Sequence, residues 1–66
     1  MIELNKLYWS KKGTLYRTIM FTNMSSTKDT HIPSITYQRI YDNELWSQPI
    51  TRFLTKFIMV LLIHNK

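Results

Sequence analysis

The chain has 66 residues, no cysteine and a formal net charge of +5 at pH 7. Without cysteine it forms neither a disulfide nor a thiolate metal site, and its two histidines, His31 and His64, show no paired metal-ligand spacing. A chain this short buries only about 60% of the surface that its unfolded form exposes, so we expect a single domain, residues 1–66, with a small core. The positive charge favours anionic partners, although it also serves solubility alone.

Two strands joined by a tight turn are predicted at the start of the chain. Residues 6–10, "KLYWS", are rich in aromatic and apolar side chains, and Gly13 follows in the turn "KKG", where it accepts a positive φ without steric cost. Residues 14–22 alternate as a strand does. One face is expected to carry Leu15, Arg17, Ile19 and Phe21, and the other Tyr16, Thr18, Met20 and Thr22.

The middle of the chain predicts a polar loop and two more strands. Residues 23–30, "NMSSTKDT", have the composition of a loop, and residues 31–41 that of a third strand that starts after Pro33 or lies at an edge there. Residues 42–44, "DNE", predict the next turn, and residues 45–47, "LWS", a short fourth strand.

A short helix and a last strand are expected at the end of the chain. Pro49 suits the first turn of a helix, and Ile50, Phe53 and Leu54 then repeat on one helical face. We predict that Phe53 and Leu54 close one end of the core and that Trp46 anchors the preceding strand inside it. Residues 57–63, "FIMVLLI", follow as a strand that is apolar on both faces and is therefore expected to be buried on both.

These elements together predict a mainly β fold: a small barrel of about five strands with one short helical turn before the last strand. The order of elements resembles that of an SH3-like barrel, in which the last strand also follows a short helical turn.

Three segments resemble a short bacterial and phage family of unknown function. Its pattern K-G-x-x-Y, V-x-Y-x-x-L-Y and L-W-x-R-P-L-x-x-F is matched over residues 7–57 by the stretches Lys12 to Tyr16, Ile35 to Tyr41 and Leu45 to Phe53. The resemblance implies an SH3-like barrel. It departs at polar positions, where Ser10 replaces a histidine, Gln48 replaces an arginine, and Met24-Ser25-Ser26 stands near an expected His-Ser-Glu triplet.

The sequence does not suggest an enzyme. The possible nucleophiles are serines and threonines, with no histidine and acid at triad-like positions, and a single glycine cannot build a phosphate-cradling loop. Asp42 and Glu44 stand in a predicted turn, where solvated charges are expected. We therefore expect no catalysis, no metal and no cofactor.

Aromatic and cationic side chains alternate along the predicted strands in a way that suits flat anionic ligands. Aromatic rings stack on bases, and guanidinium groups bind phosphates. The ordinary alternative is that the rings fill the core and the long cations cover its edges. The predicted ligand-binding residues are Trp9, Tyr16, Arg17, Tyr37, Arg39 and Arg52, with Gln48 as a further polar group beside Arg52.

Three functions fit these features. The first is sequestration, without turnover, of an anionic nucleotide-type ligand such as a host defence signalling nucleotide, by a phage-encoded anti-defence protein. The second is a nucleic-acid-binding SH3-like module, and the third is a protein-interaction module that inhibits a host enzyme. A composition rich in residues with AT-rich codons and without alanine favours a low-GC bacterium or one of its phages as the source.

The two ends of the chain allow a prediction of where the protein is located and whether it forms oligomers. The apolar residues 57–63 are too few to span a bilayer, which needs about 20, and the N-terminus lacks a signal-peptide pattern, so we expect a soluble, cytoplasmic protein. The same apolar end, in a small domain without disulfides, favours a homodimer or a higher homo-oligomer.

Overall fold

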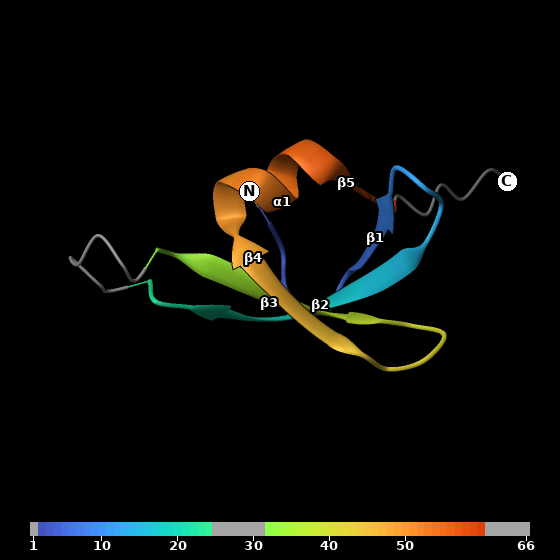
Figure 1. Ribbon diagram of the computed structural model, residues 1–66, viewed down its shortest axis with the longest axis horizontal. Coiled ribbons are helices and arrows are strands. Elements are labelled where there is room, and N and C mark those ends of the chain that lie inside the picture. Colours follow the sequence, from blue (N-terminus) through green and yellow to red (C-terminus); the bar gives the residue numbers. More distant parts are fainter. Residues whose placement is uncertain (1, 25–31, 61–66) are drawn as a thin grey trace, which may run out of the picture.

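The computed structural model of the protein describes residues 2–24 and 32–60. In chain order the elements are β1 (Leu7–Ser10), β2 (Leu15–Thr22), β3 (Ser34–Arg39), β4 (Leu45–Pro49), α1 (Ile50–Lys56) and β5 (Phe57–Met59). The five strands form one antiparallel sheet in the order β4-β3-β2-β1-β5. The predicted fold class is confirmed: the fold is mainly β, a small SH3-like barrel with a short helix before the last strand (Figure 1).

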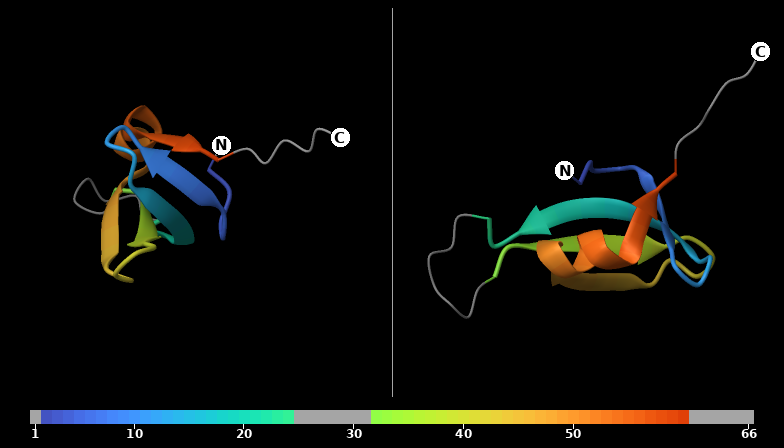
Figure 2. Two further views of the ribbon diagram at one scale, coloured as in Figure 1. Left: turned by 90° about the vertical axis from the view of Figure 1, so that its right-hand side faces the viewer. Right: turned by 90° about the horizontal axis from the view of Figure 1, so that it is seen from above.

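The sheet curls until its two edge strands, β4 and β5, lie on either side of α1 (Figures 1 and 2). The helix bridges these edges without any loop, because it begins directly after Pro49 and ends directly before Phe57. Its first N–H, on Ile50, donates to the carbonyl of Pro33 at 3.1 Å, which takes the place of a side-chain cap. The helix has seven residues, about two turns, where the sequence predicts a single turn or slightly more.

The turn between β1 and β2 has the glycine conformation that the sequence predicts. Gly13 has φ +85°, and its N–H donates to the carbonyl of Ser10 at 3.0 Å. The Ser10 N–H donates to the carbonyl of Thr14 at 2.9 Å, and the Thr14 N–H donates to Ser10 Oγ at 3.1 Å. These bonds fix the loop that carries Lys11 and Lys12.

The strict alternation predicted for β2 is wrong in its second half. Thr18 pairs with Tyr37 and Met20 pairs with Thr36, so one residue of β2 is extra between them and forms a bulge. The bulge shifts the inward-facing positions by one residue. As a result, Phe21 packs against the core on the side of Tyr16 and not on the predicted side of Arg17.

The core is built around aromatic rings and is centred on Phe53. The buried apolar residues are Ile2, Tyr8, Ile35, Tyr37 and Phe53. Phe53 has no exposed surface, and its ring stacks on that of Phe57 with centroids 4.2 Å apart and an angle of 8° between the planes. The rings of Tyr8 and Tyr37 contact Phe53 at centroid distances of 5.2 and 5.1 Å. Phe53 therefore joins the helix to three strands.

Three core expectations from the sequence are wrong. Trp46 is 43% exposed, since it lies on the edge strand β4. Leu54 is 51% exposed, because the face of α1 that packs on the sheet is formed by Ile50 and Phe53, and Leu54 lies beside that face. Ile58 is 68% exposed, so β5 is buried on one face only.

The boundaries also differ from expectation at β3 and β4. β3 ends at Arg39 and not at Tyr41, because the Asn43 N–H donates to the Arg39 carbonyl at 2.8 Å and closes the turn. β4 continues to Pro49, which pairs with Ser34. Residues 25–31 and 61–66 lie outside the described residues, and with them most of the predicted loop, His31, His64 and the end of the predicted last strand.

The N-terminal segment is held to the sheet by the buried Thr18. Its hydroxyl donates to the Glu3 carbonyl at 2.6 Å and accepts from the Lys6 N–H at 3.2 Å. The Asn5 N–H donates to the Thr18 carbonyl at 2.8 Å. These bonds hold Ile2 against the core, where only 3% of its surface is exposed.

Among the described residues, no helix has the length and the apolar composition that a bilayer crossing requires.

We predict that Phe53→Ala lowers the free energy of unfolding by about 3–5 kcal/mol, because it removes the ring that joins the helix to the sheet. Trp46→Ala is expected to cause a much smaller loss, since 43% of Trp46 is exposed. Thermal and urea unfolding of the two variants beside the parent measures both effects. Equal losses would contradict the placement of Phe53 at the centre of the core.

We also predict that Thr18→Val destabilises the fold by about 1–3 kcal/mol, because it leaves the Glu3 carbonyl and the Lys6 N–H without their partner. Thr36→Val is the matched control. Its hydroxyl is shared with Ser47 at 2.6 Å in an exposed position, so water replaces the lost bond. Urea unfolding should separate the two variants, and equal midpoints would show that the Thr18 hydroxyl contributes nothing.

Candidate ligand-binding cleft

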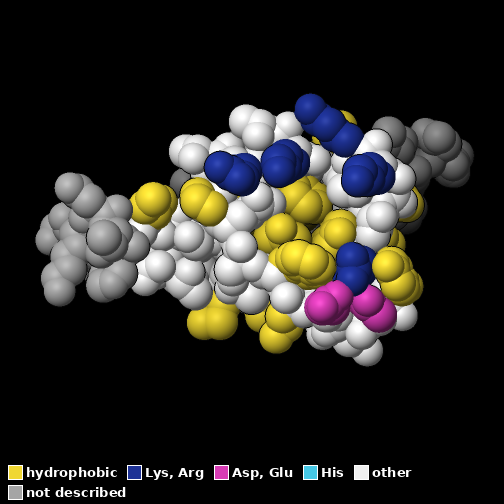
Figure 3. Space-filling model, viewed as in Figure 1, with side chains coloured by type: hydrophobic (Ala, Val, Ile, Leu, Met, Phe, Trp, Pro, Cys, Tyr) yellow, Lys and Arg dark blue, Asp and Glu magenta, His cyan; other side chains and the backbone are white. Residues whose placement is uncertain are grey.

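An open cleft of about 930 Å³ lies between the two edges of the sheet, beside α1. Every element of the barrel contributes to it, together with the β1–β2 turn. Its lining residues are Ser10, Lys11, Lys12, Thr14, Tyr16, Tyr37, Arg39, Trp46, Ser47, Gln48, Pro49, Arg52, Lys56 and Phe57. In Figure 3 this face shows hydrophobic side chains in a hollow with lysine and arginine side chains around it. The volume matches that of small-molecule sites in proteins, which enclose about 300–1,000 Å³.

The floor of the cleft is aromatic and belongs to the core. Tyr16, Tyr37 and Phe57 meet edge to face, with ring centroids 5.1 to 5.3 Å apart. They come from β2, β3 and β5 and reach the cleft because each occupies an inward-facing position of its strand. Since the core holds these rings in place, the floor is formed before any ligand arrives.

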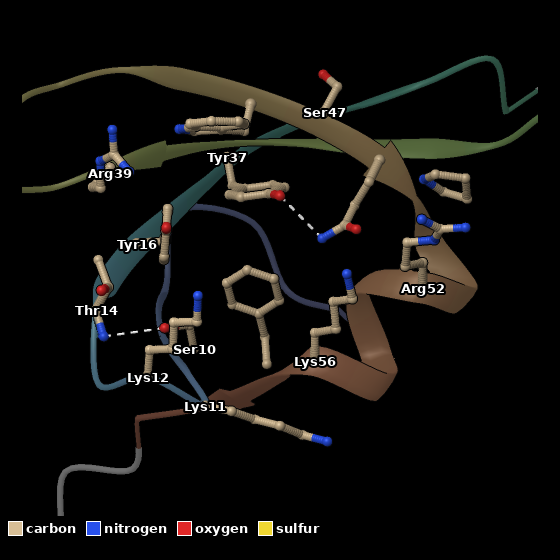
Figure 4. A pocket seen from close by; sticks show the side chains of 14 residues that line it. Ser10, Lys11, Lys12, Thr14, Tyr16, Tyr37, Arg39, Ser47, Arg52 and Lys56 are labelled. Carbon is tan, nitrogen blue, oxygen red and sulfur yellow. Dashed lines mark hydrogen bonds between the residues drawn. The ribbon is translucent and has the colours of Figure 1, made fainter.

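A hydrogen bond between Gln48 and Tyr37 supplies polar atoms at the floor. Gln48 Nε2 donates to the Tyr37 hydroxyl oxygen at 3.0 Å (Figure 4). Burial raises the pKa of Tyr37 above 10.0, the neighbouring Tyr16 raises it further, and the bond from Gln48 opposes the shift. Tyr37 therefore keeps its proton at neutral pH, and its hydroxyl remains able to donate a hydrogen bond.

Arg39 is held by the acidic turn that follows it. Its Nε donates to Asp42 Oδ1 at 3.0 Å, its Nη2 donates to Asp42 Oδ2 at 2.9 Å, and Nη2 also donates to Glu44. The guanidinium carbon lies 5.0 Å from the ring centroid of Tyr41 and 5.3 Å from that of Trp46. We call Arg39, Asp42 and Glu44 the arginine clamp; two carboxylates offset the charge of Arg39 while its planar group contacts the indole.

The other cations of the cleft have no acidic partner within the described part of the chain. The two ion pairs found among residues 2–24 and 32–60 both belong to Arg39. The remaining cations that line the cleft, which we call the cationic wall, come from the β1–β2 turn and from α1: Lys11, Lys12, Arg52 and Lys56. In Figure 4, Lys12 and Lys56 point toward the cavity from either side. None of the described lining residues is acidic.

Four of the six residues predicted to bind a ligand line this cleft. Tyr16, Tyr37, Arg39 and Arg52 come together there, as does the additional predicted residue Gln48. The two others, Trp9 and Arg17, do not join them. Trp9 neighbours the buried Tyr8, and Arg17 neighbours the buried Thr18, so strand alternation turns both to the outer face of the sheet. Arg17 lines a smaller hollow on that side, with Glu3 and Lys6.

Sequence reasoning did not select Trp46, Lys56 or Phe57 as site residues. Trp46 was expected in the core, yet its position directly opposite Tyr37 in the β3–β4 ladder places it in the cleft wall. Lys56 follows Arg52 by four residues, which places both on one face of α1, and this spacing could have identified it. Phe57 reaches the cleft only because the barrel closes, and no pattern among its neighbours in the sequence indicates this position.

The cleft presents aromatic surface, an amide, a phenol, several hydroxyls and several cations. Within the described part of the chain, no group of three or more histidine, cysteine, aspartate or glutamate residues could hold a metal ion.

Comparisons with protein-family models, with curated proteins and with solved structures found no match to this chain. The resemblance to the short bacterial and phage family stays a prediction, and a functional assignment rests on the geometry of the cleft.

The arginine clamp predicts a pH dependence. The hydrogen bond from Arg39 lowers the pKa of Asp42 below its ordinary value of 3.8. Because the folded pKa is lowered, the clamp stabilises the fold above the ordinary pKa, and this stabilisation is lost as the pH falls through the lowered value. A carbon-detected NMR titration of Asp42 should give a midpoint below 3.8, and Arg39→Gln should move the midpoint back up. A parent midpoint at or above 3.8 would show that the clamp does not persist in solution.

Proposed function

We propose that the protein binds a compact anionic ligand of nucleotide type and releases it chemically unchanged. The observation that carries this proposal is the cleft itself: an aromatic floor with cations on its rim and no acidic residue among its described lining residues. Aromatic faces accept a flat ring, and unpaired lysine and arginine groups attract phosphate.

The protein would act by sequestration. A binder that holds a nucleotide without altering it lowers the free concentration of that nucleotide, and a signalling nucleotide is the ligand for which such a reduction has the largest effect. The described lining residues support this form of the proposal, because they bring together aromatic, amide and cationic groups that suit binding.

Nucleic acid is the second candidate, and one observation favours it. The cleft follows the edge strand β4, where Trp46 is 43% exposed, so a longer strand could continue beyond it. Single-stranded nucleic acid uses the same groups, with bases on aromatic rings and phosphates on cations.

A thermal-shift panel tests the proposal. The protein is heated with mononucleotides, cyclic nucleotides and short oligonucleotides at low and moderate salt, and we expect mononucleotides to raise the melting temperature. Mass spectrometry of the recovered ligand should find it unchanged. Stabilisation by oligonucleotides alone, collapsing as salt is added, would assign the cleft to nucleic acid. No response to any of these ligands would overturn the proposal.

A pair of charge variants ties the response to the cleft. Arg52→Gln removes a cation that lines it, whereas Arg17→Gln makes the same change on the outer face of the sheet. We expect the first variant to weaken nucleotide binding by about tenfold, since a hydrogen bond to a charged group contributes about 1.5–3 kcal/mol, and the second to leave it unchanged. Equal losses in both would indicate a diffuse charge effect.

A further inference from the structure

The two sides of the cleft differ in charge. One side is the cationic wall, formed by Lys11, Lys12, Arg52 and Lys56. The other side is formed by Trp46 and Arg39, and there two carboxylates offset the charge of Arg39, the one cation that the described residues place on this side. Figure 3 shows the difference directly: the acidic side chains lie on one side of the hollow, around one cation, and the other basic side chains follow the opposite side.

This asymmetry gives Arg39 a role other than the one predicted from the sequence. Its side chain is 19% exposed, it bonds both Asp42 and Glu44, and it lies against the Trp46 ring. Because two carboxylates already pair with this guanidinium, it attracts a phosphate only weakly. It instead lies against the indole of Trp46 on the edge strand β4, with its guanidinium carbon 5.3 Å from the ring centroid. Arg39 is therefore a positioning residue for a stacking surface.

The polar atoms next to this surface match the edge of a base. Gln48 uses one N–H for Tyr37, and its second N–H and its amide oxygen have no partner among the described residues. An acceptor beside a donor complements the donor and acceptor edge of adenine. Gln48 is on the same strand as Trp46, two residues further on, and so faces the same side of the sheet.

We infer that the ligand is a nucleotide with two or more phosphate charges and that it binds in one orientation, which deepens the function proposed above and rests on it. The base lies on Trp46 beside Gln48, and the phosphates reach across the aromatic floor to Lys12, Arg52 and Lys56. The cationic wall has several cations without an acidic partner among the described residues, and these match several negative charges better than the single charge of a cyclic mononucleotide.

The test uses a protein in which Trp46 is the only tryptophan. The chain has two tryptophans, and Trp9 lies outside the cleft, so Trp9→Phe leaves the fluorescence of Trp46 as a local reporter. Adenosine, AMP, ADP and cyclic AMP are titrated into this variant at two salt concentrations. We expect every one to quench Trp46, and the affinity to rise by about tenfold for each added charge-assisted contact, with ADP binding most tightly.

Two variants separate the roles of the two sides. Lys56→Gln should reduce the affinity for ADP toward the affinity for AMP, and should make ADP binding less dependent on salt. The affinity for adenosine should stay unchanged. Arg39→Gln should weaken adenosine and ADP by the same factor and leave the salt dependence unchanged, because it disturbs the stacking surface and not the phosphate contacts. Arg39→Lys keeps the charge but loses the planar group, and should behave like Arg39→Gln.

The outcomes distinguish this inference from the proposed function. If neither adenosine nor any nucleotide binds, the proposed function fails, and the inference fails with it. If nucleotides bind without quenching Trp46, or if Arg39→Gln lowers the salt dependence of ADP binding, the ligand orientation is wrong while nucleotide binding stands. Equal affinities for ADP and cyclic AMP would likewise overturn the requirement for several charges. Urea unfolding of each variant confirms that the binding measurements compare folded proteins.

Discussion

The stacked pair Phe53 and Phe57 is the contact on which the rest of the structure depends. The two rings are four residues apart, one inside α1 and one at the first position of β5, and their centroids are 4.2 Å apart. The helix has only seven residues, and an isolated helix of that length is not stable in water. Burying Phe53 stabilises the helix, and the stack on Phe57 places β5 beside β1. The same stack fixes the space between the sheet edges and therefore the cleft.

The two sides of the cleft differ because the charge of one lining cation, Arg39, is offset by nearby carboxylates. The basic lining residues are alike in type, but the turn after β3 returns Asp42 and Glu44 to Arg39. The cations of α1 and of the β1–β2 turn have no acidic partner among residues 2–24 and 32–60. The difference arises from a turn in which Asn43 adopts φ 60°, a conformation that asparagine tolerates better than most residues. A local backbone feature thus determines which cations remain for a ligand.

Local patterns in the sequence predicted the succession of strands and helix along the chain, the turn at Gly13 and the helix before the last strand, because each depends on neighbouring residues. What they missed depends on contacts between distant residues. The bulge in β2 follows from pairing with β3, and the exposure of Trp46 follows from the edge position of β4. For the site, residue type identified Tyr16, Tyr37, Arg39 and Arg52, but only the strand faces showed that Trp9 and Arg17 point elsewhere, and only the barrel's closure brought Phe57 into the floor.

The aromatic floor serves both the core and the cleft, and this limits how the protein can change over evolution. Phe57 and Tyr37 contact Phe53, so a substitution that reshaped the floor would also weaken the fold. The exposed residues Lys11, Lys12, Arg52 and Lys56 lack such contacts, and exposed positions usually change stability by no more than about 0.5 kcal/mol. Mutation can therefore alter the charge and shape of the cleft's rim at little risk to folding, which makes this small barrel an adaptable scaffold for selection and for laboratory design alike.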